Sequence, residues 1–194
     1  MFYSVLQKIF YGVFRLFNRS EIIGIENLPK NEKIIICPNH KSNWDPIFVS
    51  CNIKPQIHWM AKVELKKIPI LGIFIQAMGA FYVDRGAADI GALKNAMKLL
   101  KENEIVGIFP EGTRVYSENP DNAKAGVALI AHRTKAKVVP VYIEGEYRIF
   151  KKLRLIIREP ISYENLPKKL TTEEYENLSK SIMKKVYNIK ELGD

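Results

Sequence analysis

The chain has 194 residues, enough for one domain with a full hydrophobic core, and its apolar share of 47% and charged share of 26% are ordinary for a globular protein. Its two cysteines, Cys37 and Cys51, exclude a disulfide framework and a cysteine metal site. Basic residues (30) outnumber acidic ones (21), so the formal charge of +9 predicts an anionic partner. Charge alone does not choose among a phosphate ligand, an anionic membrane, an acidic protein and nucleic acid.

Residues 1–19 are predicted to form an amphipathic helix. Lys8 and Arg15 interrupt it, and it is too short to span a bilayer. Two interpretations stay open: an interfacial helix lying among lipid headgroups, and an ordinary packing helix. The apolar side chains, four of them phenylalanine, recur at helical spacing at Phe2, Val5, Leu6, Ile9, Phe10, Val13, Phe14 and Phe17.

Short apolar strands alternate with helical patterns along the rest of the chain. This alternation predicts an α/β fold with a mixed, mostly parallel central sheet flanked by helices, and no linker divides it. The predicted strands are residues 21–25, 33–37, 57–61, 80–83, 105–109, 138–143 and 153–157. The predicted helices are residues 46–51, 70–78, 88–102, 123–133 and 171–190, the last opened by a capping-box pattern.

Proline and glycine break the apolar run at residues 68–83, so it should not form one spanning helix. Such a segment is most simply core. It would also suit the wall of a groove for a long hydrocarbon chain.

A turn with the sequence Asn-His-Lys-Ser-Asn-Trp-Asp follows the second strand at residues 39–45. On one helix, residues five apart face different ways, so His40 and Asp45 meet only if a turn folds between them. The serine and asparagine between them favour such a turn. A carboxylate on one imidazole nitrogen would fix the tautomer and leave the other nitrogen free as a base. The structural alternative is that Asp45, which precedes Pro46, simply caps a helix.

The sequence Phe-Pro-Glu-Gly-Thr-Arg leaves a second predicted strand at residues 109–114. In open α/β sheets, ligands bind at the carboxyl ends of strands. Arg114 offers a fork of donors suited to a phosphate, and Gly112 allows close backbone approach. Arg85 likewise follows an apolar strand, so two arginines and His40 converge on one edge. The alternative is a polar turn with an exposed ion pair.

These stretches resemble, in order and spacing, the motifs of the glycerolipid acyltransferases, specifically the 1-acylglycerol-3-phosphate acyltransferase family of bacterial type. The motif Asn-His-x-Ser-x-x-Asp matches residues 39–45, and Phe-Pro-Glu-Gly-Thr-Arg is met in full at 109–114. A Gly-x-x-Phe-Ile-x-Arg type matches 79–85 loosely, and an apolar-Pro-apolar segment matches 138–141. The resemblance covers roughly residues 20–145.

The resemblance implies transfer of a fatty acyl group from an acyl thioester to the 2-hydroxyl of lysophosphatidate, giving phosphatidate in phospholipid synthesis. His40 would be the general base and Asp45 its orienter, with direct attack and no acyl-enzyme. No cofactor and no metal are implied; acyl-CoA or acyl carrier protein is the co-substrate. The implied substrate-binding residues are Arg85, Glu111, Gly112, Thr113, Arg114 and Lys62.

The expected organisation is a membrane-association helix at residues 1–19 and an acyltransferase domain at 20–194. We expect peripheral or monotopic attachment to the anionic surface of the cytoplasmic face of the cell membrane, and no nucleic-acid partner. Four alternatives stay open. They are a glycerol-3-phosphate or other lysophospholipid acceptor, a non-catalytic basic binding module, a cysteine hydrolase using Cys37 with His40, and a metal site. The metal site lacks a clear third ligand, because His58 and His132 occur in unrelated contexts.

Overall fold

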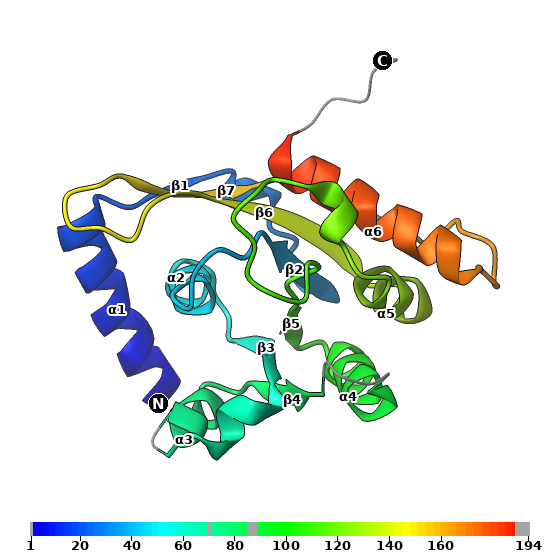
Figure 1. Ribbon diagram of the computed structural model, residues 1–194, viewed down its shortest axis with the longest axis horizontal. Coiled ribbons are helices and arrows are strands. Elements are labelled where there is room, and N and C mark those ends of the chain that lie inside the picture. The colour runs from blue at the N-terminus through cyan, green and yellow to red at the C-terminus, as the bar shows by residue number, and fades with distance from the viewer. Residues whose placement is uncertain (1, 70, 85–88, 189–194) are drawn as a thin grey trace.

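The structure is a computed structural model that describes residues 2–69, 71–84 and 89–188. Its centre is a seven-stranded sheet in the order β1-β7-β6-β2-β5-β3-β4 (Figure 1). Neighbouring strands run parallel except β6 and β7, which confirms the predicted mixed, mostly parallel sheet. The strands are β1 Glu21–Ile23, β2 Ile34–Pro38, β3 Ile57–Lys62, β4 Phe81–Val83, β5 Ile105–Gly107, β6 Lys137–Gly145 and β7 Leu153–Ile157.

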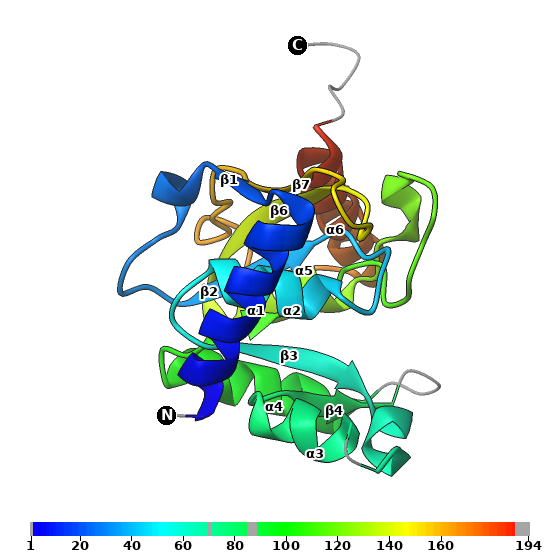
Figure 2. The same cartoon turned by 90° about the vertical axis from the view of Figure 1, so that its left-hand side faces the viewer.

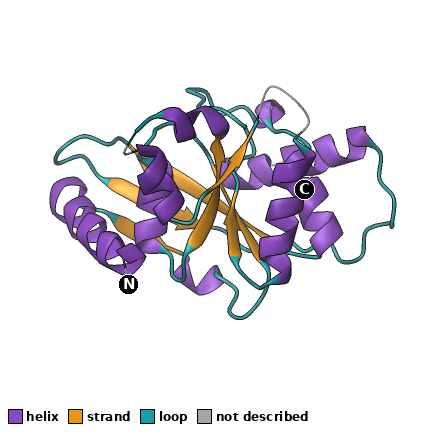
Figure 3. Ribbon diagram, turned by 90° about the horizontal axis from the view of Figure 1, so that it is seen from below, coloured by secondary structure: helices purple, strands orange, loops and turns teal. Residues whose placement is uncertain are grey.

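Helices cover both faces of the sheet (Figures 1 and 3). One face carries α1 Phe2–Asn18 and α2 Asp45–Asn52, and α3 Leu71–Ala77 lies at the β4 edge. The other face carries α4 Ile90–Lys101, α5 Gly126–Thr134 and α6 Thr172–Tyr187.

The central strand β2 is buried on both faces, as its unbroken apolar sequence predicts. Because side chains alternate along a strand, Ile34 and Ile36 pack in the cluster beneath α1 and α2. Ile35 and Cys37 pack in the cluster beneath α4, α5 and α6. This double burial fixes the position at which β2 ends, and with it the turn at residues 39–45.

Each predicted helix and strand is present, and most bounds differ from the prediction by one to three residues. The capping box that opens α6 is confirmed, with Thr171 and Glu174 bonding to each other's backbone N–H. Extension of β5 to residue 109 was wrong: the strand ends at Gly107, and beyond it the Ile108 N–H still donates to the Ile36 carbonyl at 3.0 Å. The first two strands, although consecutive in the chain, do not pair with each other: β1 pairs with β7, and β2 with β5 and β6.

Helix α1 lies along the outside of the domain beside α2 (Figure 2), and the apolar side predicted for it is partly buried and partly exposed. Its inner side packs on α2: Phe14 is 5% exposed, and the buried Gln7 donates to the carbonyl oxygens of Ser50 and Ile53 at 2.6 and 3.0 Å. The packing interpretation therefore holds for this side. The outer side remains exposed at Val5, Ile9, Val13, Leu16 and Phe17, with Lys8, Arg15 and Arg19 along it.

Among the described residues, we find no helix both long enough and apolar enough to cross a bilayer.

Candidate active site

Two loops meet at the carboxyl edge of the sheet. Because β2 and β5 are parallel neighbours, the turn after β2 and the loop at residues 109–114 leave the sheet side by side. Backbone bonds join them: the His40 N–H donates to Glu111 Oε2 at 2.8 Å, and the Val115 N–H donates to the His40 carbonyl at 2.8 Å. The two stretches singled out in the sequence therefore form one site.

The side chains of His40 and Asp45 are in contact, as the turn predicted. Nδ1 of His40 lies 2.9 Å from Oδ2 of Asp45, whose carboxylate is fully buried. A carboxylate only accepts, so Nδ1 carries the proton and Nε2 is left with a free lone pair. Oδ2 also accepts from the backbone N–H groups of Lys41 and Ser42, each at 2.7 Å. Asp45 is thus the first residue of α2, and its carboxylate points back into the turn instead of capping the helix.

The other oxygen of Asp45 binds a residue that the sequence analysis missed. The hydroxyl of Tyr147 donates to Asp45 Oδ1 at 2.7 Å. Burial and the neighbouring carboxylate raise the pKa of Tyr147 well above its usual value, so the phenol stays protonated and keeps donating. Its ring packs against Phe14 of α1 and Phe48 of α2. Tyr147 follows the carboxyl end of β6, so the strand-end rule applied to a third strand would have found it.

A stack of three rings orients the imidazole. The His40 ring lies on Phe109 with centroids 3.9 Å apart and 22° between planes, and Phe109 lies on Trp59 at 4.9 Å and 17°. Gly107 makes room for this stack, because a Cβ there would lie 2.4 Å from the Trp59 ring. The indole N–H donates to Ser50 Oγ at 2.8 Å, which fixes the far end.

Asn39 anchors the start of the turn to β6. Its buried amide donates to the Ile143 carbonyl at 3.2 Å and accepts from the Ile143 N–H at 2.7 Å. The side chain thereby continues the pairing of β2 with β6 for one step beyond the strand. Asn39, which precedes His40, is therefore held in place by its side-chain bonds to β6 and by its direct connection to the end of β2.

Glu111 lies inside the protein, with its carboxylate 1% exposed. One oxygen accepts from the His40 N–H, and the other accepts a very short hydrogen bond from the Tyr187 hydroxyl of α6. Burial, assisted by the charge of Asp45, raises the pKa of Glu111 to about 7, against the lowering effect of these two bonds. Tyr187, also missed in the sequence, thus supports the His40 backbone through Glu111.

The other predicted site residues lie nearer the surface. Gly112 adopts a left-handed φ of +68°, which favours glycine, and Thr113 and Arg114 follow it exposed. Lys62 ends β3 at the same sheet edge, half exposed and 2.9 Å from Glu64. Arg85 lies outside the described residues.

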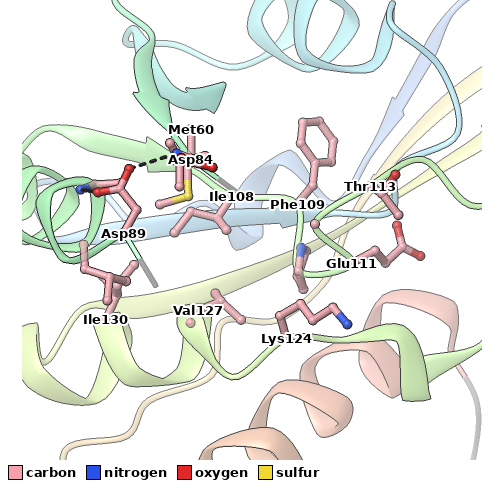
Figure 4. Close-up of a pocket in the computed structure, with 16 residues that line it drawn as sticks. Met60, Asp84, Asp89, Ile108, Phe109, Glu111, Thr113, Lys124, Val127 and Ile130 are labelled. Carbon is pink, nitrogen blue, oxygen red and sulfur yellow. Dashed lines mark hydrogen bonds between the residues drawn. The ribbon is translucent and has the colours of Figure 1, made fainter. Parts of the chain in front are cut away.

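A cavity of about 440 Å³ opens beside the Glu111 loop (Figure 4). Thr113 and Lys124 lie with Glu111 at one end, and Asp84 and Asp89 lie at the other. The apolar walls come from Met60, Ile108, Val127 and Ile130. Lys124 is a cation that the sequence analysis did not single out. The cavity thus has apolar walls and two polar ends, one at the motif of residues 109–114 and the other at the carboxylates of Asp84 and Asp89.

The rival site residues have structural partners. Cys37 is fully buried, and burial raises the pKa of its thiol well above the usual value, as expected for inert core packing. His58 bonds to the Gly79 carbonyl, and His132 to the Tyr175 hydroxyl. Within the described residues, no three metal-binding side chains gather closely enough to hold an ion.

Glu111 is expected to make the stability of the fold depend on pH. Its pKa is about 7 when folded and 4.5 for the free group, so between these values the folded state holds a proton that the unfolded chain has released. The stability that the group contributes is therefore present below pH 4.5 and lost as pH rises through 7, by roughly 3 kcal/mol. Chemical denaturation of wild type and Glu111→Gln across this range should show their difference in unfolding free energy shifting by that amount. A difference independent of pH would contradict the assignment.

Tyr147→Phe is expected to lower kcat/KM at neutral pH by roughly tenfold, because a hydrogen bond to a charged group is lost while the ring packing is kept. Without the phenol, the Asp45 carboxylate attracts the proton on His40 more strongly. The low-pH limb of the pH–rate profile should therefore move to higher pH. A fall in rate without this displacement would show that Tyr147 acts only through packing.

The fold and the site define an α/β enzyme with a histidine–aspartate pair at the carboxyl edge of its sheet, beside an apolar cavity. The sequence model of the family described as Acyltransferase matches residues 19–144. The chain belongs to this acyltransferase family and is an O-acyltransferase, as the resemblance implied.

Individual relatives agree with this assignment. The chain is 40% identical over 158 residues to the 1-acyl-sn-glycerol-3-phosphate acyltransferase of Bacillus subtilis, covering 77% of this chain and 78% of the relative. It is 30% identical over 205 residues to the Saccharomyces cerevisiae protein of that name, covering 97% of this chain and 66% of the relative. The crystal structure of the 1-acyl-sn-glycerophosphate (LPA) acyltransferase PlsC from Thermotoga maritima superimposes with a TM-score of 0.71 at 27% identity, covering 99% of this chain and 81% of that one.

Proposed function

We propose that the chain transfers a fatty acyl group from acyl-CoA or acyl carrier protein to the 2-hydroxyl of lysophosphatidate, giving phosphatidate. The observation that carries this proposal is the buried Asp45 carboxylate that holds His40 with Nε2 free, in a member of the acyltransferase family. The names of the relatives support the choice of acceptor. No cofactor or metal is needed, because a thioester already carries a good leaving group.

In the proposed reaction, Nε2 of His40 takes the proton of the 2-hydroxyl as its oxygen attacks the thioester carbonyl. The new C–O bond forms, the C–S bond breaks, and the proton passes from His40 to the departing thiolate. Asp45 keeps the imidazole in the correct tautomer and stabilises its charged form. An alcohol is a poor nucleophile until a base accepts its proton, and a positioned base supplies roughly 10²–10⁴-fold in rate.

The glycerol phosphate is proposed to bind at the exposed end of the second motif loop. Arg114 supplies a rigid fork of donors, Thr113 a hydroxyl, and Gly112 an approachable backbone. Charge-assisted contacts of this kind contribute about 1.5–3 kcal/mol each. Lys62 and Arg85 are proposed as further cations.

Because both oxygens of Glu111 already bind protein groups, we assign it an indirect part in substrate binding. It fixes the loop that carries Arg114 against the turn that carries His40. The cavity beside this loop is proposed to receive an acyl chain along its apolar walls, with the chain entering from the polar end at Thr113 and stopping short of Asp84 and Asp89 at the other end.

The outer side of α1 is proposed to lie in the headgroup region of the cytoplasmic face of the cell membrane, with residues 20–194 as the acyltransferase domain. Exposed apolar side chains with cations beside them favour an anionic interface. This attachment would bring a membrane-borne acceptor to the enzyme.

The test is a transfer assay with a labelled acyl group, run with acyl-CoA and with acyl carrier protein as donors. Lysophosphatidate, glycerol-3-phosphate and a second lysophospholipid are the acceptors, all dispersed in detergent. Transfer of the label to lysophosphatidate, giving phosphatidate, that is faster than transfer to either of the other acceptors supports the proposal, and the donor that works identifies the co-substrate. Faster transfer to glycerol-3-phosphate or to the second lysophospholipid would overturn the choice of acceptor.

A further inference from the structure

The turn between β6 and β7 has two exposed apolar side chains at its tip. Ile149 is 65% exposed and Phe150 is 73% exposed. Arg148 and Lys151, also exposed, lie on either side of them, and Arg148 pairs with the exposed Glu146 at 3.4 Å. This large apolar pair at the tip of the turn contributes nothing to the core of the described residues.

The backbone conformation of Phe150 is also unusual. Its φ is +66°, in the left-handed region, where a bulky side chain is a genuine outlier. Glycine would hold this conformation without strain, and the exposed ring gains no packing that offsets it. A strained residue that the fold itself does not need is a reason to look for a function.

The turn is fixed to the end of α1. The Phe150 N–H donates to the Phe17 carbonyl at 2.6 Å, and the Asn18 amide donates to the Arg148 carbonyl at 2.9 Å. Figures 1 and 2 show the yellow turn beside the C-terminal end of the blue helix. The exposed residues Leu16, Phe17, Ile149 and Phe150 therefore belong to one apolar surface, fringed by Arg15, Arg19, Arg148 and Lys151.

We propose that Ile149 and Phe150 insert into an anionic lipid bilayer beside α1, as a second point of membrane attachment. Apolar tips ringed by cations match the chemistry of an anionic interface, where the rings enter the acyl boundary and the cations meet the headgroups. This inference rests on the proposed membrane attachment of α1 and adds the element that sets its orientation.

The same turn carries Tyr147, which holds Asp45. Two separate attachment points define the tilt of the protein on the bilayer, whereas a single helix leaves rotation about its axis free. Insertion of the turn would therefore set the height of His40 above the lipid that supplies the acceptor.

Site-specific fluorescence on the full chain tests the proposal. Both native cysteines are buried, so a thiol introduced by Ile149→Cys can be labelled selectively with an environment-sensitive dye. Addition of vesicles of phosphatidylglycerol and phosphatidylcholine should shift its emission to the blue, and high salt should weaken the response. Ile90→Cys, 62% exposed on the opposite face of the sheet, is the matched control and should not respond. Leu16→Cys reports on α1 separately.

Phe150→Gly separates a structural role from a binding role. The variant should melt at the same or a higher temperature, because the left-handed strain is relieved. Its partition coefficient onto the same vesicles should fall by roughly tenfold, as expected for removing one large apolar side chain from the acyl boundary. A variant that binds vesicles as wild type does would overturn the proposal.

The outcomes distinguish this inference from the proposed function. A response at Leu16→Cys with none at Ile149→Cys would overturn the inference and leave α1 attachment standing. No response at either position would remove both forms of attachment, while the detergent assay still tests acyl transfer independently. Conversion of a dimer to a monomer by Phe150→Gly, without change in vesicle binding, would show that the surface pairs two copies of the chain and would overturn the proposal.

Discussion

His40→Ala is expected to lower kcat/KM for acyl transfer by roughly 10²–10⁴-fold, the range that a positioned general base supplies. The imidazole is 12% exposed, and its ring is held from three directions, by Asp45, by Phe109 and by its own fixed backbone. These contacts fix the orientation of the imidazole ring. Removing the ring leaves substrate binding largely intact, so the loss should appear in kcat more than in KM.

The measurement compares wild type and variant at equal folded concentration in the detergent assay, with thermal unfolding as a check on the fold. His58→Ala is the matched control, because His58 is a second partly buried histidine with a carbonyl partner away from the His40 turn. It should retain close to full activity. Equal rates for wild type and His40→Ala would mean that the base lies elsewhere.

Much of the fold follows from local sequence because the central strands are buried on both faces. Strand β2, for example, is apolar throughout and could hardly be anything but a central strand. Which strands pair is less predictable, since β1 joins β7 from the far end of the chain. A three-residue strand carries no signal for so distant a partner.

Some contacts of the site could likewise be predicted from the sequence, and others could not. The contact of His40 with Asp45 was predictable because both residues lie within one short turn at a strand end. The interior position of Glu111 was not, because it depends on Tyr187, a single hydroxyl from the last helix. The role of Tyr147 was unpredictable for the same reason. Its ring packs against the core, and its only link to the site is the hydrogen bond from its hydroxyl to Asp45. Long-range single hydrogen bonds leave no periodic trace in a sequence.

Helix α1 shows how an apolar pattern can be correct yet incomplete. Phenylalanines at helical spacing predicted one apolar side, but Phe10 and Phe14 turn toward Trp44 and Phe48 of the domain. The spacing does not record where the neighbouring helix lies. The position of α2 decides which part of the apolar pattern is buried and which is left for another partner.

Asp45→Asn is expected to lower kcat/KM by roughly 10–10³-fold, the effect of removing an opposite charge that favours the protonated base. The backbone N–H groups of Lys41 and Ser42 both point at Oδ2, so the asparagine must place its oxygen there and its amide toward Tyr147. The oxygen can still accept from Nδ1 of His40, so the tautomer is kept. Only the charge is lost, and the variant should remain above His40→Ala in activity.

The pH–rate profile separates this explanation from a loss of structure. Without the negative charge, His40 gives up its proton more easily, so the low-pH limb should move to lower pH, opposite to the displacement expected for Tyr147→Phe. The two variants alter the two oxygens of one carboxylate and should displace the profile in opposite directions. Displacement in the same direction, or none in Asp45→Asn, would show that the carboxylate does not act through its charge on His40. Both profiles are recorded with thermal unfolding at each pH, so that partial unfolding is not mistaken for titration.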